Sequence, residues 1–478
     1  MAQLAYTSPA PNDAANEIDN SSERVNRGCR APNRFVKGNA AISVHSPIVY
    51  FCAMRSHALL DELQWRGLLY QHTEEVADVL NSGPVGGYIG FDPTAPSLHV
   101  GNLLVIMLLV QLQRHGHRPV ALVGGGTGLI GDPSGKTSER PLAEPEVIAA
   151  NAAQIRKQLE RFLDFTGPNA ARVIDNAEWL VALRAVDFMR DVGKHFTVNY
   201  MLQKDAVKGR MEDGISYTEF SYMLLQAYDF LELRRRHDVR LQMGGSDQWG
   251  NITAGIELIR RTIGSDAHAV TAPLITTSTG TKFGKTEAGA IWLDPTLTTP
   301  YKFYQFWINI DDRDASRYLR YFTLLDRSRI EQLDGELAEH PELRGAQRTL
   351  AREVTLLVHG DKAVGAAEEV SELLFGGADA KALSRDALLA LQLEIPVFTV
   401  EPKDDLTTYD LLEATLVGPD ALFASKGDMR RMLQQGGVYL NGRRLGVERE
   451  PLAPEDLLAG EFVLLRKGAK SYGLVKAR

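Results

Sequence analysis

Residues 88–102 read Tyr-Ile-Gly-Phe-Asp-Pro-Thr-Ala-Pro-Ser-Leu-His-Val-Gly-Asn, and this stretch decides the fold. It predicts a short strand, a turn with two prolines that ends the strand, and then a helix. Ser97 is a suitable N-cap for the apolar run that follows. His99 and Asn102 then fall in the first helical turn, where backbone N–H groups favour a nucleotide phosphate. A histidine at a helix start is also common for structural reasons, so the rest of the chain must decide.

Composition excludes several classes of protein. The chain has 478 residues and ordinary apolar and charged fractions, which predicts two to four globular domains. The longest apolar run, residues 103–110, is far shorter than a membrane span and indicates a buried helix. The only cysteines, Cys29 and Cys52, give the main body no disulfide framework, which fits a reducing cytoplasm.

Charge and local pattern divide the chain. Residues 1–53 are rich in Ala, Asn, Ser and Pro and are predicted to be a disordered extension, with a more ordinary start at Met54. The net charge is −8, yet the chain from Ala421 onward has eleven Lys or Arg against six Asp or Glu. A basic tail fits a polyanionic partner, and it also fits a plain solvated surface.

The expected domains follow from these patterns, and each covers one continuous range. They are an α/β catalytic domain over residues 54–300, an α-helical domain over 301–380, a linker with little core over 381–406 and a small domain over 407–478.

A glycine-rich loop follows a second expected strand, in residues 119–137. It invites comparison with a P-loop, but Ile130 stands where that motif requires its first glycine. We therefore expect glycines that let the backbone approach a ligand, with Asp132 and Lys136 as polar neighbours.

The apolar helix expected over residues 216–231 has a polar stripe. Tyr222, Gln226 and Asp229 fall on one face, at i, i+4 and i+7. This face is either the solvated side of the helix or the wall of a pocket for a small polar substrate.

Two further loops have the composition of ligand loops. Residues 244–251 form another strand–loop–helix junction, in which Asp247 could bind ribose hydroxyls or, like Ser246, could cap the helix. Residues 279–287 place Lys282 and Lys285 around a glycine, which suits a loop that neutralises a triphosphate and is also typical of a surface turn.

The last part of the chain predicts a nucleic-acid contact. Residues 425–445 predict a basic helix, a Gly-Gly stop, a strand and an Asn-Gly hairpin turn. Lys426, Arg430 and Arg431 share about one helical face, which suits a phosphate backbone.

Taken in order, these segments resemble the bacterial-type tyrosyl-tRNA synthetases, which are class I enzymes with a C-terminal S4 domain. Residues 99–102 (His-Val-Gly-Asn) match the family's HIGH signature, and residues 282–286 (Lys-Phe-Gly-Lys-Thr) match its KMSKS signature. Residues 88–92, 131–136 and 220–230 resemble its pocket segments.

The resemblance implies a fold and an activity. The fold is α/β, with a Rossmann-like parallel-sheet catalytic domain, an α-helical domain and a small α+β S4-like RNA-binding domain. The activity is a ligase reaction in which ATP activates L-tyrosine and the tyrosyl group passes to tRNA(Tyr). The resemblance also implies a cytoplasmic homodimer without membrane contact. Mg²⁺ is expected with ATP, without a dedicated protein metal site or a tightly bound cofactor.

By similarity, the resemblance assigns site residues in four groups. The tyrosine-binding residues are Tyr88, Asp92, Asp132, Tyr222, Gln226, Asp229 and Gln248. The ATP- and adenylate-binding residues are Gly90, His99, Gly101, Gly245, Asp247 and Lys285. The residues that act on the transition state are Thr94, His99, Asn102, Lys136, Arg140, Lys282, Lys285 and Thr286. The tRNA-binding residues are Lys426, Arg430 and Arg431.

Two alternatives stay open at this point. A tryptophanyl-tRNA synthetase shares the fold and class, but it lacks the S4 tail and would not need the Tyr88 and Asp229 pair for a phenol. The other alternative is an RNA-binding protein with the synthetase shape but no activity, which the intact His99, Lys282 and Lys285 argue against.

Overall fold

The computed structural model describes residues 58–134, 142–211, 214–280, 283–286, 289–401, 403 and 405–477, without the side chains of 205, 206, 285 and 286. The expected N-terminal extension therefore lies outside the described residues. So do Lys136, Arg140 and Lys282, together with the side chains of Lys285 and Thr286.

A six-stranded sheet forms the centre of the catalytic domain, in the order β1-β6-β5-β2-β3-β4. All neighbours are parallel except β1, which pairs antiparallel with β6 at one edge. The strands are β1 (Gln71–His72), β2 (Gly86–Phe91), β3 (Arg118–Val123), β4 (Arg172–Asp175), β5 (Val239–Gly245) and β6 (His268–Ala272). From β2 the chain proceeds to β3 and β4 on one side, and then returns to β5 and β6 on the other. The carboxyl ends of β2 and β5 therefore flank a topological switch point, where open α/β sheets bind ligands.

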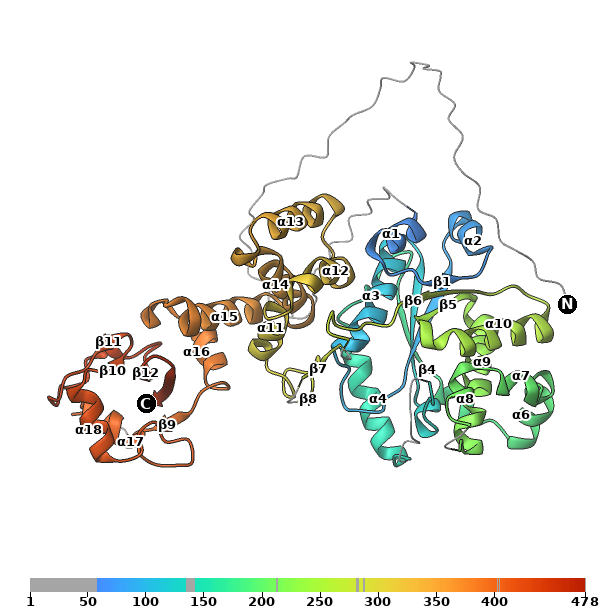
Figure 1. The fold of residues 1–478 in the computed structure, drawn as a ribbon. Coiled ribbons are helices and arrows are strands. Elements are labelled where there is room, and N and C mark those ends of the chain that lie inside the picture. The colour runs from blue at the N-terminus through green and yellow to red at the C-terminus, as the bar shows by residue number, and fades with distance from the viewer. Residues whose placement is uncertain are drawn as a thin grey trace, which may run out of the picture. The chain divides into compact units, whose positions relative to one another are not determined.

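Helices cover both faces of this sheet, as Figure 1 shows for α3 and α4 on one side and α9 and α10 on the other. The described helices of this domain are α1 (Leu59–Arg66), α2 (Val76–Ser82), α3 (Val100–Arg114), α4 (Pro145–Leu159), α5 (Ala177–Leu180), α6 (Ala185–Asp191), α7 (Val198–Leu202), α8 (Asp205–Lys208), α9 (Tyr217–His237) and α10 (Trp249–Ile263). The expected α/β class with a parallel sheet is confirmed.

Side chains alternate between the two faces along β2. Ile89 and Phe91 belong to the core that contains the buried residues of α3 and α4. Tyr88 belongs to the core that α9 and α10 build on the opposite face. Because side chains alternate along the strand, the Tyr88 side chain lies on the same face of the sheet as α9, the helix that contains the polar stripe.

The helix after β2 begins two residues later than we expected. Its N-cap is His99 and not Ser97, because His99 accepts a bond from its own first turn. The Ser97 hydroxyl instead donates to the Leu98 carbonyl and accepts from the Gln158 side chain, so it serves the loop. The correction places the histidine at the helix entrance and not inside the first turn.

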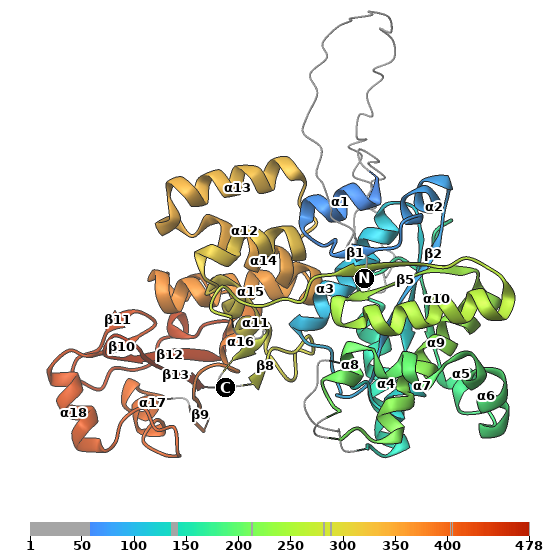
Figure 2. The ribbon, with the colours of Figure 1, turned by 45° about the vertical axis from the view of Figure 1, so that its right-hand side comes forward.

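A group of helices follows the catalytic domain, and Figure 2 shows α12, α13 and α14 packed side by side. Its helices are α11 (Pro300–Ile308), α12 (Asp312–Phe322), α13 (Arg327–Glu339), α14 (Gly345–His359) and α15 (Asp361–Ser371), with a π-helical turn at Glu372–Gly376. Its core is aromatic, since Phe303, Trp307 and Phe322 have no exposed surface (0%). The helical pattern expected from residue 301 onward is confirmed.

The C-terminal part contains a five-stranded sheet in the order β11-β10-β12-β13-β9, in which only β9 and β13 pair in parallel. Its elements are α16 (Arg385–Leu391), β9 (Val397–Thr399), α17 (Thr408–Ala414), α18 (Lys426–Gln434), β10 (Val438–Leu440), β11 (Arg443–Arg444), β12 (Phe462–Lys467) and β13 (Ser471–Lys476). The expected Asn-Gly turn is confirmed, because Asn441 and Gly442 both have positive φ, 47° and 87°.

The expectation of little core between residues 381 and 406 is wrong. Ala387, Leu388 and Leu391 of α16 are fully buried (0% exposed). They belong to the same apolar cluster as Phe462 on β12. These partners lie some 70 residues away in sequence, so no local pattern could reveal them.

Candidate active site

The residues expected to bind the substrate gather at the carboxyl ends of β2 and β5. Asp92 follows β2, and residues 246–248 form a 3-10 turn between β5 and α10. The other expected substrate-binding residues come from α9, which contains the polar stripe. The neighbouring strand ends supply further polar groups, because β3 and β4 are parallel to β2.

The polar stripe of α9 is buried. Tyr222 is 5% exposed and Asp229 is 2% exposed, which rules out the solvated-side interpretation. Burial raises the pKa of Tyr222 well above its ordinary value, and the nearby Asp92 and Asp132 carboxylates raise it further. The phenol therefore stays protonated and acts as a hydrogen-bond donor.

Tyr88 packs against α9, near enough to Asp229 for the charge of that carboxyl to act on it. The Tyr88 ring packs on Phe230 with centroids 5.2 Å apart, and the residue is 1% exposed. Burial, and then the Asp229 charge, raise the pKa of Tyr88. Its hydroxyl has no hydrogen-bond partner among the described residues. A buried donor and acceptor of this kind costs free energy unless a ligand pairs with it.

Two residues that sequence reasoning missed hold Asp229. Asn176 donates its Nδ2–H to Asp229 Oδ2 at 2.9 Å, and Trp179 donates its Nε1–H to Asp229 Oδ1 at 2.7 Å. Burial raises the pKa of Asp229 to about 8, although these two bonds act in the opposite direction. A signal existed in the sequence, because both residues follow the expected strand at Val173 and Ile174.

Asp92 connects the strand end to the stripe. Tyr222 donates its hydroxyl to Asp92 Oδ2 at 2.8 Å, and Thr127 donates its hydroxyl to Asp92 Oδ1 at 2.7 Å. Asn176 donates in turn to Thr127 Oγ1 at 2.9 Å. One hydrogen-bonded network thus joins Asp92 to Asp229 through neutral side chains.

A second network of amides surrounds Asp132. Gln248 donates its Nε2–H to Asp132 Oδ2 at 2.7 Å, and Gln226 donates to Gln248 Oε1 at 3.2 Å. Asn251, which sequence reasoning missed, donates to Gln226 Oε1 at 3.0 Å. Asp132, Gln226 and Gln248, which come from three separate segments of the sequence, therefore belong to one hydrogen-bonded network.

Asp247 is an exposed residue beside this network. Desolvation of its carboxyl group, and then the Asp132 charge, raise the pKa of Asp247. The N-cap residue of α10 is Gln248 and its side chain makes no capping bond, so neither Ser246 nor Asp247 caps this helix. The site contains five acidic side chains, Asp92, Asp132, Asp175, Asp229 and Asp247, and it suits a ligand with a positive charge.

His99 is fixed at the start of α3 by a reciprocal cap. The Gly101 N–H donates to His99 Nδ1 at 3.0 Å, and the His99 N–H donates to Asn102 Oδ1 at 3.0 Å. The neutral imidazole therefore has its proton on Nε2. A Cβ on Gly101 would lie only 2.7 Å from the His99 ring, so the ring requires glycine at this position.

The structure also describes three smaller residues that were expected in the site, namely Gly90, Thr94 and Gly245. Gly90 is the one exposed residue of β2, and a Cβ there would meet no atom within 4 Å. The Thr94 N–H donates to the Asp92 carbonyl at 2.9 Å within the turn. A Cβ on Gly245 would lie 2.6 Å from the Asp247 carboxylate.

Comparisons with known proteins agree on one family. The family model for class I tRNA synthetases (W and Y) matches residues 80–376, and the model for the SYY-like C-terminal domain of tyrosine–tRNA ligase matches residues 391–475. The tyrosine–tRNA ligase of Anaeromyxobacter dehalogenans is 55% identical over 88% of this chain and 99% of its own length. That of Roseiflexus castenholzii is 52% identical over 87% of this chain and 99% of its own length.

This chain belongs to the tyrosine–tRNA ligase family. The resemblance seen in the sequence is therefore confirmed, and the chain is an aminoacyl-tRNA synthetase of class I. A solved structure agrees: a C-terminally truncated mitochondrial tyrosyl-tRNA synthetase of Aspergillus nidulans is 30% identical, with a TM-score of 0.61 over 67% of this chain and 95% of that chain. The tryptophanyl alternative is thus excluded.

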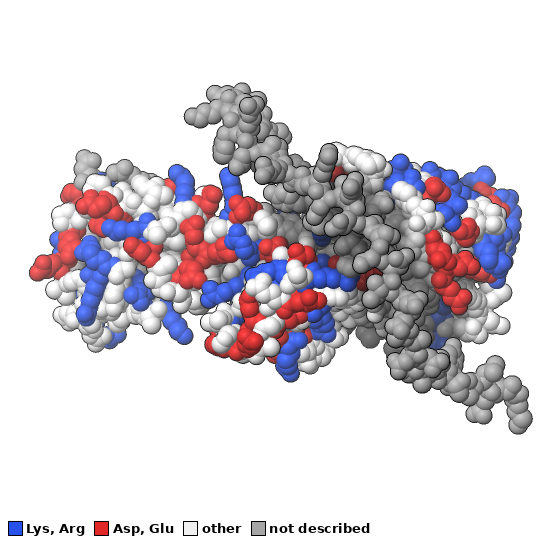
Figure 3. All heavy atoms as spheres, turned by 90° about the horizontal axis from the view of Figure 1, so that it is seen from above, with Lys and Arg blue, Asp and Glu red and all other residues white. Residues whose placement is uncertain are grey.

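The basic residues expected on the S4-like part of this ligase are exposed and mostly paired. Lys426 contacts Glu413 at 2.9 Å and Arg431 contacts Asp428 at 2.5 Å, while Arg430 forms no ion pair with any described residue. On the face drawn in Figure 3, basic and acidic side chains are interleaved. An RNA phosphate would have to compete with these acidic partners.

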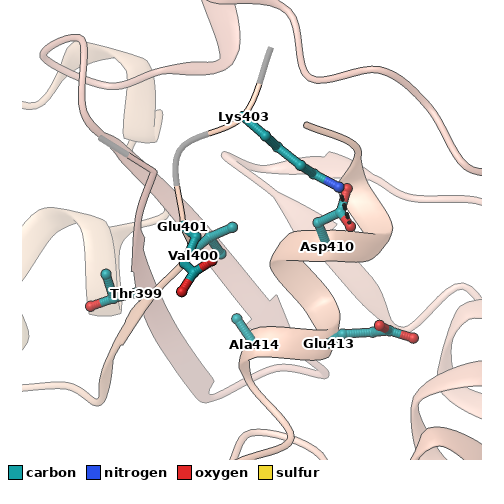
Figure 4. Close-up of a pocket in the computed structure, with 7 residues that line it drawn as sticks. All are labelled: Thr399, Val400, Glu401, Lys403, Asp410, Glu413 and Ala414. Atoms are coloured by element: carbon teal, nitrogen blue, oxygen red, sulfur yellow. Dashed lines mark ion pairs between the residues drawn. The ribbon is translucent and has the colours of Figure 1, made fainter. Parts of the chain in front are cut away.

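A pocket of about 320 Å³ lies beside α17 in the C-terminal part. Figure 4 shows the residues that line it. Lys403 pairs with Asp410 at 2.9 Å on its wall. The Lys403 charge is therefore already neutralised, and Glu413 pairs with Lys426, which does not line the pocket. We assign no ligand to this pocket.

Within the described ranges, no group of three or more His, Cys, Asp or Glu side chains could hold a metal ion. The same residues contain no helix that is long and apolar enough to cross a membrane.

Proposed function

We propose that this chain joins L-tyrosine to tRNA(Tyr) in two steps at the carboxyl ends of β2 and β5. In the first step, a carboxylate oxygen of tyrosine attacks the α-phosphorus of ATP. A new O–P bond forms, the bond to the β-phosphate oxygen breaks, and pyrophosphate leaves. In the second step, a terminal ribose hydroxyl of the tRNA attacks the activated carbonyl carbon, loses its proton, and AMP leaves.

The buried pair of Tyr88 and Asp229 is the observation that supports tyrosine most strongly. A substrate phenol can hydrogen-bond to the Asp229 carboxyl group and to the Tyr88 hydroxyl, whose hydrogen-bonding capacity is otherwise unused among the described residues. Phenylalanine would leave the buried Tyr88 hydroxyl without this partner, and Asp229 would keep only its bonds to Asn176 and Trp179. Tyrosyl-tRNA synthetases are the established example of such rejection of phenylalanine without a separate editing step.

The acidic network suits the substrate ammonium. Asp132 carries a charge that Gln248 orients, and Tyr222 and Gln226 supply neutral oxygens at the same end of α9. Because Asp92 already accepts from Tyr222 and Thr127, its place is at the edge of the substrate carboxylate and the reacting centre. Such positioning lowers the barrier by alignment, without a protein nucleophile.

The ATP side is built from glycines and polar side chains. Gly90, Gly101 and Gly245 leave room for the adenylate, and Asp247 accepts from its ribose hydroxyls. His99, held with Nε2 protonated, donates toward the phosphates together with Thr94 and Asn102.

The remaining residues act on the charge that develops on pyrophosphate. We assign this role to the cations Lys136, Arg140, Lys282 and Lys285 and to the hydroxyl of Thr286. Mg²⁺ accompanies ATP; the described carboxylates form no metal cluster, so the phosphates themselves would hold the ion.

The assembly is part of the same proposal. Lys426, Arg430 and Arg431 contact the tRNA backbone. Exposed apolar side chains between α5 and α9, such as Val186 at 78% and Tyr217 at 66%, support a homodimer through this region. We place the enzyme in the cytoplasm.

Amino-acid-dependent ATP–pyrophosphate exchange tests this function. Exchange should be fastest with tyrosine, far slower with phenylalanine, and absent with tryptophan. Absence of exchange with every amino acid would contradict the activity, and exchange with tryptophan alone would contradict the substrate. Sedimentation of the full chain at about twice the monomer mass would support the dimer.

A further inference from the structure

Phe283 lies between the two lysines of the signature loop, and its side chain points away from the active site. It is 8% exposed. Its ring contacts Phe306 and Trp307 of α11 with centroids 5.6 and 5.7 Å apart. It contacts Tyr318 of α12 at 4.9 Å, and it stacks on Phe322 of α12 at 5.4 Å with planes 14° apart. We call these four rings the aromatic socket.

The socket gives one loop residue an unusually strong attachment to the helical domain. Burial of an aromatic side chain is stabilising, and each well-placed ring pair adds to this stabilisation. A loop that only needed to display two lysines would gain nothing from an apolar residue at this point.

The next residue attaches the same loop to the catalytic domain. The Ile291 N–H donates to the Gly284 carbonyl at 3.1 Å, and the Val100 N–H donates to the Ile291 carbonyl at 2.9 Å. Gly284 has φ of 77°, and a Cβ there would lie 2.5 Å from Val100 Cγ2. The backbone of the loop is therefore pressed against the start of α3, one residue after His99.

Two adjacent residues thus fix the loop in two directions. Phe283 fixes it to α11 and α12, and Gly284 fixes it to the first turn of α3. Lys282 directly precedes this double attachment and Lys285 directly follows it in the sequence. The short hairpin of β7 (Lys285–Thr286) and β8 (Gly289–Ala290) then leads back to Ile291.

We propose that Phe283 is a positioning residue for adenylate formation, because the aromatic socket sets the point from which the loop lysines reach the pyrophosphate. This inference rests on the proposed function of Lys282 and Lys285. Phe283 itself touches no substrate. The simpler alternative is that Phe283 only fills the core of the helical domain, and the two accounts differ in what its loss does to catalysis.

The test compares Phe283→Leu with a matched change elsewhere in the same core. Phe303 is equally aromatic and fully buried, and its ring contacts Trp307 and His359, not Phe283. In single-turnover measurements on the full chain, Phe283→Leu should slow tyrosyl-adenylate formation about tenfold to a hundredfold, as for a misplacement of about 1 Å. Tyrosine affinity should stay within about twofold, since the loop acts on the transition state.

Phe303→Leu should leave this rate within about twofold of the unchanged chain, although it destabilises the same helices. Phe283→Met should recover most of the rate, because a thioether packs well among aromatic rings. Equal rate losses in Phe283→Leu and Phe303→Leu would overturn the proposal and leave only a core-filling role.

A double-variant cycle decides whether Phe283 acts through the loop. In a Lys285→Ala background, Phe283→Leu should cost no more than about twofold in rate, because its effect passes through the lysine. The same fold loss in both backgrounds would overturn the proposal. Failure of the proposed function is recognised separately, since the unchanged chain would then form no tyrosyl-adenylate.

Discussion

Trp179 donates its indole N–H to Asp229 at 2.7 Å, and this bond links a residue after β4 to the carboxylate that we assign to the substrate phenol. Both side chains are buried, at 4% and 2% exposed. The bond fixes one oxygen of Asp229, and the Asn176 bond fixes the other. The geometry of the phenol site is therefore set by residues that the substrate does not touch.

Trp179→Phe removes this donor and keeps an aromatic ring. A hydrogen bond to a neutral group is worth about 0.5–1.5 kcal/mol, so tyrosine affinity should fall by about threefold to tenfold. Equilibrium binding of tyrosine measures the change. Trp65→Phe is the matched control, because Trp65 lies on α1 and stacks under Arg66, Arg320 and Arg327. An undiminished affinity in Trp179→Phe would show that Asp229 does not need its indole partner.

The raised pKa of Asp229 has a consequence for stability. Its folded pKa of about 8 lies above the unfolded value, so the folded state holds a proton that the unfolded state releases. The free energy of unfolding should therefore fall as pH rises from about 4 to about 8. Asp229→Asn cannot titrate, so its stability relative to the unchanged chain should increase between pH 5 and pH 9 in urea unfolding.

Glu257→Gln is the control for this pH dependence. Arg260 lowers the pKa of Glu257 to about 2, with a further contribution from Arg261, so the group stays ionised across that interval in both states. The stability difference caused by Glu257→Gln should therefore stay constant from pH 5 to pH 9. A constant difference for Asp229→Asn as well would contradict the raised pKa.

The two roles of His99 can be separated by substitution. Asn is a good N-cap and Ala is a poor one, so His99→Ala should cost about 1 kcal/mol of unfolding free energy and His99→Asn should cost little. Both variants remove the imidazole, and both should slow adenylate formation to a similar extent. Urea unfolding and single-turnover kinetics provide the two readouts. If His99→Ala slowed adenylate formation and His99→Asn did not, the rate would change in parallel with the unfolding free energy. His99 would then serve only as a cap.

The sequence predicts the parallel sheet, the Asn-Gly hairpin and the basic helix α18, because each depends on a local pattern of turn residues or apolar period. It places Ser97 wrongly as the N-cap, since a nearby Gln158 binds that hydroxyl and leaves His99 to cap α3. It also misses Asn176 and Trp179, because their partner Asp229 is about fifty residues away and no period connects them. Local sequence patterns do not predict contacts between distant segments of the chain.

The basic residues of α18 should affect tRNA binding and should not affect amino-acid activation. Replacing Lys426, Arg430 and Arg431 by Gln should reduce tRNA affinity and should make the dependence of log affinity on log salt shallower by about 0.7–0.9 for each phosphate that is no longer neutralised. Tyrosine-dependent exchange should remain unchanged, since it does not require tRNA. An unaltered salt dependence would place the tRNA-binding surface elsewhere.

The assignment of the substrate phenol to Tyr88 and Asp229 is the central claim, and discrimination between tyrosine and phenylalanine tests it most directly. Tyr88→Phe removes only the hydroxyl that lacks a partner among the described residues. One neutral hydrogen bond is worth about 0.5–1.5 kcal/mol, so the ratio of kcat/KM for tyrosine over phenylalanine in pyrophosphate exchange should fall by about threefold to tenfold. An unchanged ratio would contradict the claim.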